Sequence, residues 1–236
     1  MGKPVTLLKP LNKTKLYEEI VGQLKDKIIR REIRPGDKLP PERALAQMLN
    51  VNRSTVRSAL GKLESMDLVE IRHGEGVYVK EYLESGSLEL VKELLFKKGA
   101  LDMAVFENLM DLRQLLVPEM AYHAAKNRNN ADLEQLERIA SGTGEESMAK
   151  KDMHLHHVIA RASGNVIYVL LLNAFSGQMN DYYALYFSNP DNIAETRAFH
   201  TDIYKAIKNH KPDQARQIMQ KVLKSAAEKS IRMLAE

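Results

Sequence analysis

The chain of 236 residues contains neither cysteine nor tryptophan. Without thiols it forms no disulfide, and cysteine-ligated zinc and thiol redox chemistry are excluded. No apolar run reaches about 18 residues and no apolar segment follows a basic N-terminus, so we expect neither a membrane span nor a signal peptide and place the protein in the cytoplasm. A glycine-rich phosphate loop and a nucleophile elbow are also missing, so the motifs give little support to an enzyme.

The residues that are present suit one or two folded domains with unequal charge. The apolar fraction of 44% is sufficient for proper cores. Residues 1–80 hold 16 Lys and Arg against 10 Asp and Glu, whereas the remainder holds 19 against 21. A basic first part followed by a slightly acidic second part indicates that only the first part binds a polyanion.

The stretch from Pro35 to Val79 predicts a short helix, a turn, a second helix and a small β-hairpin. A proline pair, Pro40-Pro41, starts the first helix at a position where a missing N–H costs little. Asn52 or Ser54 caps the second helix. The second helix has one aliphatic side at a spacing of 3.6 residues, made of Val56, Ala59, Leu60 and Leu63.

The other side of this second helix carries small polar residues and arginines. Ser54, Arg57, Ser58 and Gly61 lie there, with Arg53 at the N-terminal edge. Such a surface suits the DNA major groove, because small side chains let the backbone approach and arginines reach guanine edges or phosphates. The alternative is that the arginines form a solvated face.

The hairpin completes a winged helix-turn-helix pattern. Two alternating segments flank its glycine-rich tip, residues 73–76. The runs PGDKLPPER, VNRSTVRSAL and RHGEGVYV together resemble the DNA-binding domain of the GntR family of bacterial transcription regulators. The resemblance implies that double-stranded DNA is the partner, and it assigns contacts to named residues. Bases or nearby phosphates would be contacted by Arg43, Arg53 and Arg57, the DNA backbone by Ser54 and Thr55, and the minor groove by His73, Gly74 and Gly76.

We expect a mainly α protein with two domains. Residues 1–81 would form the winged helix-turn-helix domain, residues 82–87 a polar linker, and residues 88–236 an antiparallel all-α bundle of about seven helices for effector binding and dimerisation. The apolar periodicity and the Gly, Asn and Pro breaks place these helices at 88–98, 102–126, 131–140, 148–162, 166–188, 193–209 and 212–234.

Two polar groupings fall on inward faces of these predicted helices. Asp152 and His156 are four residues apart on one helix, and His200 lies mid-face on another. An Asp with two His could hold Zn²⁺ or another divalent cation; the alternative is a buried Asp–His hydrogen bond without metal. Arg113 lies among leucines, where it requires Asp152 or a bound anionic effector, unless it is internally paired or extends to solvent.

The second half resembles the FCD domain of the FadR subfamily within the same family. The resemblance rests on LRQLLVPEMAYHAA, on DMHLHHVIARASGN and on the Phe199-His200 pair with its downstream Ala206-Ile207. Many such domains hold a carboxylate effector on a divalent metal, such as Zn or Ni, through one Asp and three His. Asp152, His156 and His200 match three of these ligands, but Val222 stands at the fourth position and Val117 replaces the usual acid.

The stretch ASGNVIYVLLLNAFSG, followed by YFSNP, is similar to the fatty-acid-responsive branch of that subfamily. This similarity implies an acyl-CoA or fatty-acid effector, with Arg113 and Asn165 as effector-binding residues. The last helix departs from that branch at Ala226 and Ser230. A small metal-held carboxylate is therefore the alternative effector.

These observations favour a ligand-responsive DNA-binding regulator that is not an enzyme. Two copies would bind a pseudo-palindromic operator, because one recognition helix reads too few bases. The alternative is a metal-dependent helical-bundle hydrolase, with Asp152, His156 and His200 in its site and an appended DNA-binding module. An architectural DNA-binding protein with an inert bundle is disfavoured by Arg113 and His200 on apolar faces.

Overall fold

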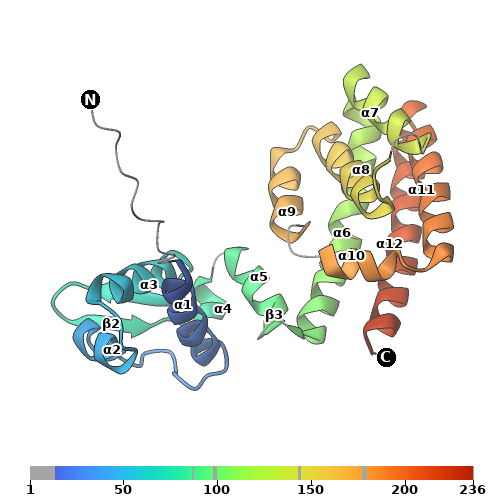
Figure 1. Ribbon diagram of the computed structural model, residues 1–236. Coiled ribbons are helices and arrows are strands. Elements are labelled where there is room, and N and C mark those ends of the chain that lie inside the picture. The colour runs from blue at the N-terminus through green and yellow to red at the C-terminus, as the bar shows by residue number, and fades with distance from the viewer. Residues whose placement is uncertain (1–13, 87, 98–99, 143–144, 177–179, 236) are drawn as a thin grey trace, which may run out of the picture. The chain divides into compact units, whose positions relative to one another are not determined.

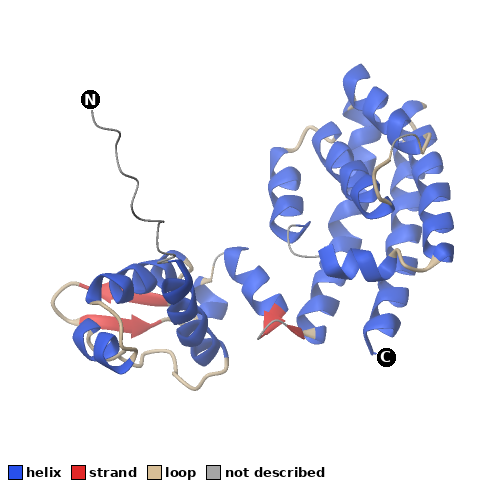
Figure 2. Cartoon of the chain, viewed as in Figure 1, coloured by secondary structure: helices blue, strands red, loops and turns tan. Residues whose placement is uncertain are grey.

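The computed structural model describes residues 14–86, 88–97, 100–142, 145–176 and 180–235. Helices make up most of these residues, and strands are short (Figure 1, Figure 2). The chain divides into two compact units, Met1–Lys97 and Lys98–Glu236. The mainly α class with an N-terminal winged module is confirmed.

The first unit begins with three helices, α1 (Thr14–Ile29), α2 (Glu42–Met48) and α3 (Arg53–Ser65). The Pro41 backbone precedes α2, and the turn to α3 passes through Asn50 with a positive φ of 51°. The apolar stripes predicted from the 3.6-residue spacing meet in one core, because each helix has only one aliphatic side to bury. That core includes Ile20, Leu24, Ile28, Leu45, Val56, Ala59, Leu60 and Leu63.

The wing is a two-stranded antiparallel hairpin of β1 (Val69–Arg72) and β2 (Gly76–Val79). Its register pairs Val69 with Val79 and Arg72 with Gly76. Val69, Val77 and Val79 are buried against the first core, which anchors the base of the hairpin while its tip stays exposed.

The boundary of the first unit lies later in the chain than predicted. Part of the expected polar linker forms a short helix, α4 (Tyr82–Ser85), and α5 (Leu88–Leu95) follows it. Tyr82 and Leu90 pack against the first core, so α4 and α5 belong to the first unit. Helical periodicity predicted a helix over residues 88–98, but a period does not indicate which of two units a helix packs against.

The second unit is a bundle of helices, as expected, but two details differ from the prediction. Two-residue strands, β3 (Phe96–Lys97) and β4 (Ala100–Leu101), lie at the unit boundary, where they are too short to show alternation. The helix expected over residues 166–188 is two helices; residues 177–179 lie outside the described residues. The helices are α6 (Met103–Asn127), α7 (Asn130–Ala140), α8 (Met148–Ala162), α9 (Val166–Ser176), α10 (Asn180–Tyr186), α11 (Pro190–Lys208) and α12 (Pro212–Ala235).

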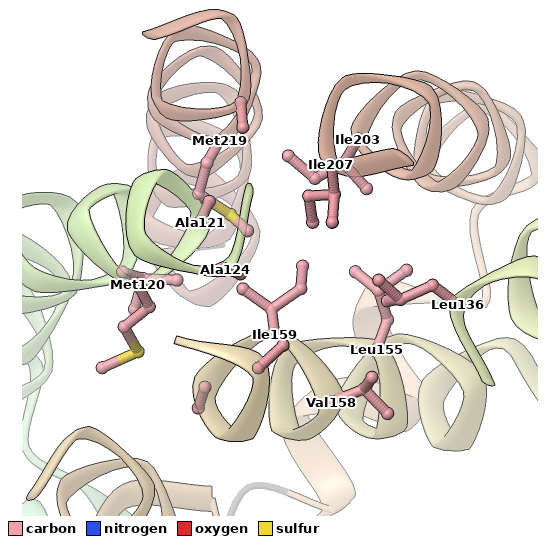
Figure 3. Close-up of a cluster of buried hydrophobic side chains, with 14 of the residues drawn as sticks. Met120, Ala121, Ala124, Leu136, Leu155, Val158, Ile159, Ile203, Ile207 and Met219 are labelled. Atoms are coloured by element: carbon pink, nitrogen blue, oxygen red, sulfur yellow. The ribbon is translucent and has the colours of Figure 1, made fainter. Parts of the chain in front are cut away.

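The core of the second unit is built mainly by α6, α7, α8, α11 and α12, whose hydrophobic side chains converge as Figure 3 shows. Leu155, Ile159, Ile203 and Ile207 are completely or almost completely buried there. Pro118 lies inside α6 without ending that helix. This packing places α6 and α8 side by side, and their polar residues share one interior.

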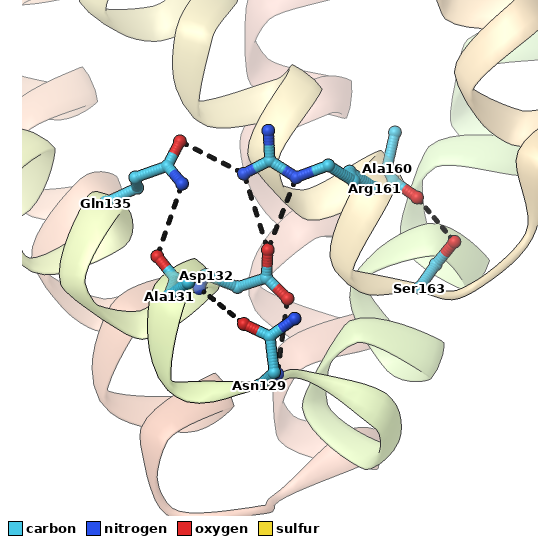
Figure 4. A network of polar contacts seen from close by, with 7 residues as sticks. All are labelled: Asn129, Ala131, Asp132, Gln135, Ala160, Arg161 and Ser163. Carbon is cyan, nitrogen blue, oxygen red and sulfur yellow. Dashed lines mark hydrogen bonds and ion pairs between the residues drawn. The ribbon is translucent and has the colours of Figure 1, made fainter.

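A buried carboxylate connects α7 to α8. Asp132 is 4% exposed, and it forms a reciprocal N-terminal cap with Asn129. Its Oδ1 also accepts hydrogen bonds of 3.3 Å from Nε and Nη2 of Arg161, and Arg161 reaches Gln135 as well (Figure 4). A buried charge requires such partners, so this network serves the fold rather than a ligand.

Candidate nucleic-acid interface and effector site

The recognition helix α3 is capped by Asn52. The Asn52 Oδ1 accepts a 2.8 Å bond from the Thr55 amide and 2.7 Å bonds from the hydroxyls of Ser54 and Thr55. The hydroxyls of Ser54 and Thr55, predicted to contact the DNA backbone, are thus engaged with the cap in this structure. Of the two capping candidates, the structure selects Asn52.

The arginines of α3 point away from the core. The side chains of Arg53 and Arg57 are 64% and 67% exposed, whereas Val56 and Leu60 on the opposite side are buried. Arg43 on α2 is exposed too. The helix therefore has one aliphatic side holding it to the domain and one cationic side facing outward, as base or phosphate contacts require.

A carboxylate that the sequence argument did not identify holds these arginines. Glu42, the first residue of α2, accepts hydrogen bonds of 2.8 Å from Nε of Arg57 and of 2.7 Å from its Nη2. Nη2 of Arg53 lies 3.9 Å from the same carboxylate. The hydrogen bond from Arg57 lowers the pKa of Glu42 below its ordinary value, so the pair stays ionised at neutral pH.

The wing tip presents exposed backbone to the solvent. His73 and Gly74 are exposed, and Gly74 has a φ of 76°, a left-handed conformation that glycine adopts without strain. Gly76 has a φ of 130°, and a Cβ there would lie 2.7 Å from Cε of Lys38. Both glycines are thus required by the turn, which leaves His73 free to project from the tip.

Arg113 lies where two cavities of the second unit meet. One cavity is narrow and mainly apolar, and the other carries more polar side chains; Arg113, His156 and Tyr183 line both. The other residues that line the mainly apolar cavity are Leu109, Met110, Leu112, Leu116, Val117, Met120, Met153, His157, Leu171 and Leu172.

Among the described residues, Arg113 has no carboxylate within ion-pair distance. Its hydrogen-bond contact is a 3.8 Å approach of Nη1 to Sδ of Met110. Asp152, the internal partner considered from the sequence, instead pairs with His200. Arg113 thus has no direct carboxylate contact among these residues, although its charge contributes to lowering the pKa of Asp152.

The predicted metal ligands come together, but around a direct contact. Nε2 of His200 and Oδ1 of Asp152 form a 2.9 Å hydrogen bond, and Nε2 of His156 lies 3.8 Å from Oδ2 of Asp152. No group of three or more His, Asp or Glu side chains in the described part of the chain is arranged to hold a metal ion. Val222 lines the polar cavity beside Asp152 and His156 and offers no donor. The residues in this arrangement do not form a complete metal site.

Burial and the neighbouring charges together determine the charge states in this cluster. Burial lowers the pKa of His156 to about 4, so this imidazole is neutral at pH 7. Burial opposes ionisation of Asp152, but the charge of His156 in acid and the hydrogen bond with His200 favour it more, so the pKa of Asp152 lies below its ordinary value. Nδ1 of His156 is buried without a hydrogen-bond partner in the described residues. At pH 7 the cluster therefore contains the ionised carboxylate of Asp152 beside the neutral imidazole of His156.

Asn165, the other predicted effector residue, lines neither of these two cavities. Its Oδ1 accepts a 3.0 Å hydrogen bond from the Ile167 amide and so caps the first turn of α9.

Tyrosines of α10 contribute hydroxyls that the sequence argument missed. Tyr182, Tyr183 and Tyr186 line the polar cavity, and burial raises the pKa of each, so all three hydroxyls stay protonated at neutral pH. The Tyr182 hydroxyl is already hydrogen-bonded to Oγ of Ser230, which donates its own proton to the carbonyl of Ala226. The helical spacing of these tyrosines, at positions i, i+1 and i+4, was the feature of the sequence that could have identified them.

These features define a class of protein. A winged helix-turn-helix with outward arginines precedes a helical unit that contains an apolar and a more polar cavity, which is the organisation of a transcription regulator with an effector-binding domain. None of the described helices has the length and apolarity needed to cross a membrane.

Comparison with known proteins gives the family. The family model for bacterial regulatory proteins of the gntR family matches residues 16–79, and the FCD domain model matches residues 108–225, half of the chain. The chain is 35% identical to the HTH-type transcriptional regulator LutR of Bacillus subtilis, over 75% of this chain and 83% of that protein. It is 30% identical to the fatty acid metabolism regulator protein of Shewanella denitrificans, over 72% of each.

The chain is also similar to the solved structure of Lar, which controls the expression of the Listeria monocytogenes agr system, with a TM-score of 0.55 at 18% identity. The match covers 95% of this chain and 98% of that chain, and it shows the fold alone. The protein belongs to the GntR family, with an FCD domain, and is a DNA-binding transcription regulator rather than an enzyme.

Proposed function

We propose that this regulator acts as a cytoplasmic homodimer on a pseudo-palindromic operator and responds to a fatty acid or its acyl-CoA ester. The observation that carries the effector proposal is Arg113, which has no direct carboxylate contact among the described residues and lines both the polar and the apolar cavity. A carboxylate or phosphate would bind the guanidinium, and an alkyl chain would lie among the Leu and Met side chains. The similarity to a relative named for fatty acid metabolism agrees with this effector class.

The neutral tyrosine hydroxyls support an anionic head group. Tyr183 lines both cavities, and Tyr182 and Tyr186 line the polar one. The hydroxyls of Tyr183 and Tyr186 beside the guanidinium favour an oxyanion, whereas Asp152 opposes one that comes too close. The head group would therefore contact Arg113 and α10 while Asp152 stays paired with His200.

Binding would be read out at the DNA as a change in operator affinity. A ligand changes this affinity only by as much as it prefers one of the two DNA-binding conformations. We expect the effector to change the dissociation constant for operator DNA by fivefold or more, a typical allosteric coupling.

The test uses a duplex enriched from a randomised library by the parent protein. Its affinity is measured by fluorescence anisotropy with saturated fatty acids of increasing chain length and with palmitoyl-CoA. Each added methylene should strengthen effector binding about threefold to fourfold until the cavity is filled, because burying one methylene contributes about 0.8 kcal/mol of binding free energy. Arg113→Ala should abolish the response, whereas Arg138→Ala, which removes an exposed arginine of α7, should retain it.

Two results would contradict the effector proposal. Equal responses to acetate and to long chains would mean that the apolar cavity is not used and would favour a small carboxylate. A full response in Arg113→Ala would show that the anion binds elsewhere.

A further inference from the structure

Glu42 places a negative charge in the middle of a surface that binds a polyanion. Its side chain is 25% exposed, and it lies against the two exposed arginines of α3. A carboxylate near DNA phosphates weakens binding by repulsion, so its presence on this surface calls for a compensating role. Electrostatics alone would favour a neutral residue at this position.

The geometry of the pair leaves one edge of Arg57 available. The carboxylate of Glu42 occupies Nε and one hydrogen of Nη2, at 2.8 and 2.7 Å. Within the described part of the chain, the two hydrogens of Nη1 and the second hydrogen of Nη2 have no acceptor, and they form the end of the guanidinium. This end is the edge that donates two parallel hydrogen bonds to O6 and N7 of guanine.

Stability of the domain is a poor explanation for the pair. The helices α2 and α3 are already joined by buried apolar side chains, including Leu45 and Leu60. Both partners are accessible to water, where an ion pair contributes little to folding. The pair instead restricts a long side chain, which lowers the entropy that Arg57 loses on meeting a base.

We propose that Glu42 is a positioning residue for sequence readout, which holds Arg57 end-on to the major groove and disfavours contacts of Arg53 and Arg57 with phosphates alone. Glu42 then determines specificity more than total affinity. The inference rests on the proposed DNA contacts of Arg53 and Arg57.

The experiment compares the full-length parent with Glu42→Gln, Glu42→Ala, Arg57→Ala and Glu84→Gln. Glu84 is an exposed acid of α4, so Glu84→Gln makes the same charge change outside α2 and α3. Dissociation constants are measured on the enriched duplex, on each of its single-base-pair variants and on a shuffled duplex, at several salt concentrations. Circular dichroism and thermal unfolding establish that each variant is folded.

Both Glu42 variants should bind the shuffled duplex more tightly and the enriched duplex no better, so the ratio of the two constants falls by about tenfold. Their salt dependence on the shuffled duplex should steepen, because freed arginines neutralise more phosphates. The preference lost in Glu42→Gln should be at the same base pair at which Arg57→Ala loses it. Glu84→Gln should keep the parent ratio within about twofold.

The outcomes distinguish the positioning role of Glu42 from the assignment of Arg57 to a base, on which that role depends. If Arg57→Ala binds every duplex like the parent, the assignment of Arg57 to a base is wrong. If Arg57→Ala loses specificity while both Glu42 variants retain it, the positioning role is overturned. Equal weakening on enriched and shuffled duplexes in the Glu42 variants would also overturn it, since that result indicates a structural role only.

Discussion

Val222 stands at the position where the family resemblance places a fourth metal ligand. It lines the polar cavity together with Asp152 and His156, but its side chain has no donor atom. Three protein ligands with an open position are sufficient for some catalytic zinc sites, so a three-ligand site at Asp152, His156 and His200 stays a prediction. The direct hydrogen bond between His200 and Asp152 is the competing arrangement.

Val222→His tests this at the scale of one residue. A fourth donor should raise the affinity for Zn²⁺ at least about tenfold over the parent in isothermal titration calorimetry, because it completes a tetrahedral shell. His200→Ala in the Val222→His background should remove the gain, and Val222→Ala serves as the size control. Equal zinc affinity of Val222→His and the parent would show that position 222 does not face the cluster's donor atoms.

Among the helices of the second unit, α6 and α12 are joined by a bidentate ion pair. Nε and Nη2 of Arg216 donate hydrogen bonds of 2.6 and 2.9 Å to the two carboxylate oxygens of Glu119. Cζ of Arg216 also lies 4.0 Å from the ring centre of Tyr122, so Glu119 and Tyr122 together restrict the guanidinium. Asp213 accepts a third bond from Nη1, but its side chain is 77% exposed.

The pH dependence of this pair follows from the direction of its pKa shift. The hydrogen bond from Arg216 lowers the pKa of Glu119 below its ordinary value. The stability it contributes is therefore present above the unfolded-state pKa of about 4.5 and disappears as the pH falls through the lower folded-state pKa. Glu119→Gln should lower the thermal midpoint at pH 7 by about 1–3 °C, and the difference from the parent should vanish in acid.

Differential scanning fluorimetry of parent and variant between pH 3 and pH 8 measures this difference. Asp213→Asn, which removes the exposed partner of the same arginine, should have the smaller effect. A Glu119→Gln difference that persisted unchanged at pH 3 would mean that shape, rather than charge, makes the contribution.

The whole molecule has two separate hydrophobic cores. The first includes buried residues from Ile20 to Leu90, and the second includes buried residues from Val117 to Leu223. No residue of either cluster belongs to the other, so each unit buries its own apolar surface. We expect unfolding in two transitions rather than one.

Truncation of one buried leucine in each unit shows which transition belongs to which unit. Leu60→Ala should destabilise the first unit and Leu136→Ala the second, each by about 2–5 kcal/mol, because both side chains are fully buried. Leu115→Ala, at a site 72% exposed, should alter neither transition. Scanning calorimetry would show the shifts, and a Leu136→Ala variant that lowered both transitions equally would contradict independent cores.

Much of the DNA-binding module was determined by local sequence. The aliphatic side of α3, its Asn52 cap and the outward direction of Arg53 and Arg57 depend on the 3.6-residue period and on capping chemistry, which act within a few residues. The inward positions of Asp152, His156 and His200 followed from the same period.

Only the tertiary structure decided which inward and outward faces meet. Glu42 joins Arg57 across a turn, and Arg113, His156 and Tyr183 come from three different helices to line the same cavities. A helical period fixes the direction of a side chain relative to its own axis. The residue it contacts depends on how each helix rotates and slides against its neighbours, which the packing of the whole core determines.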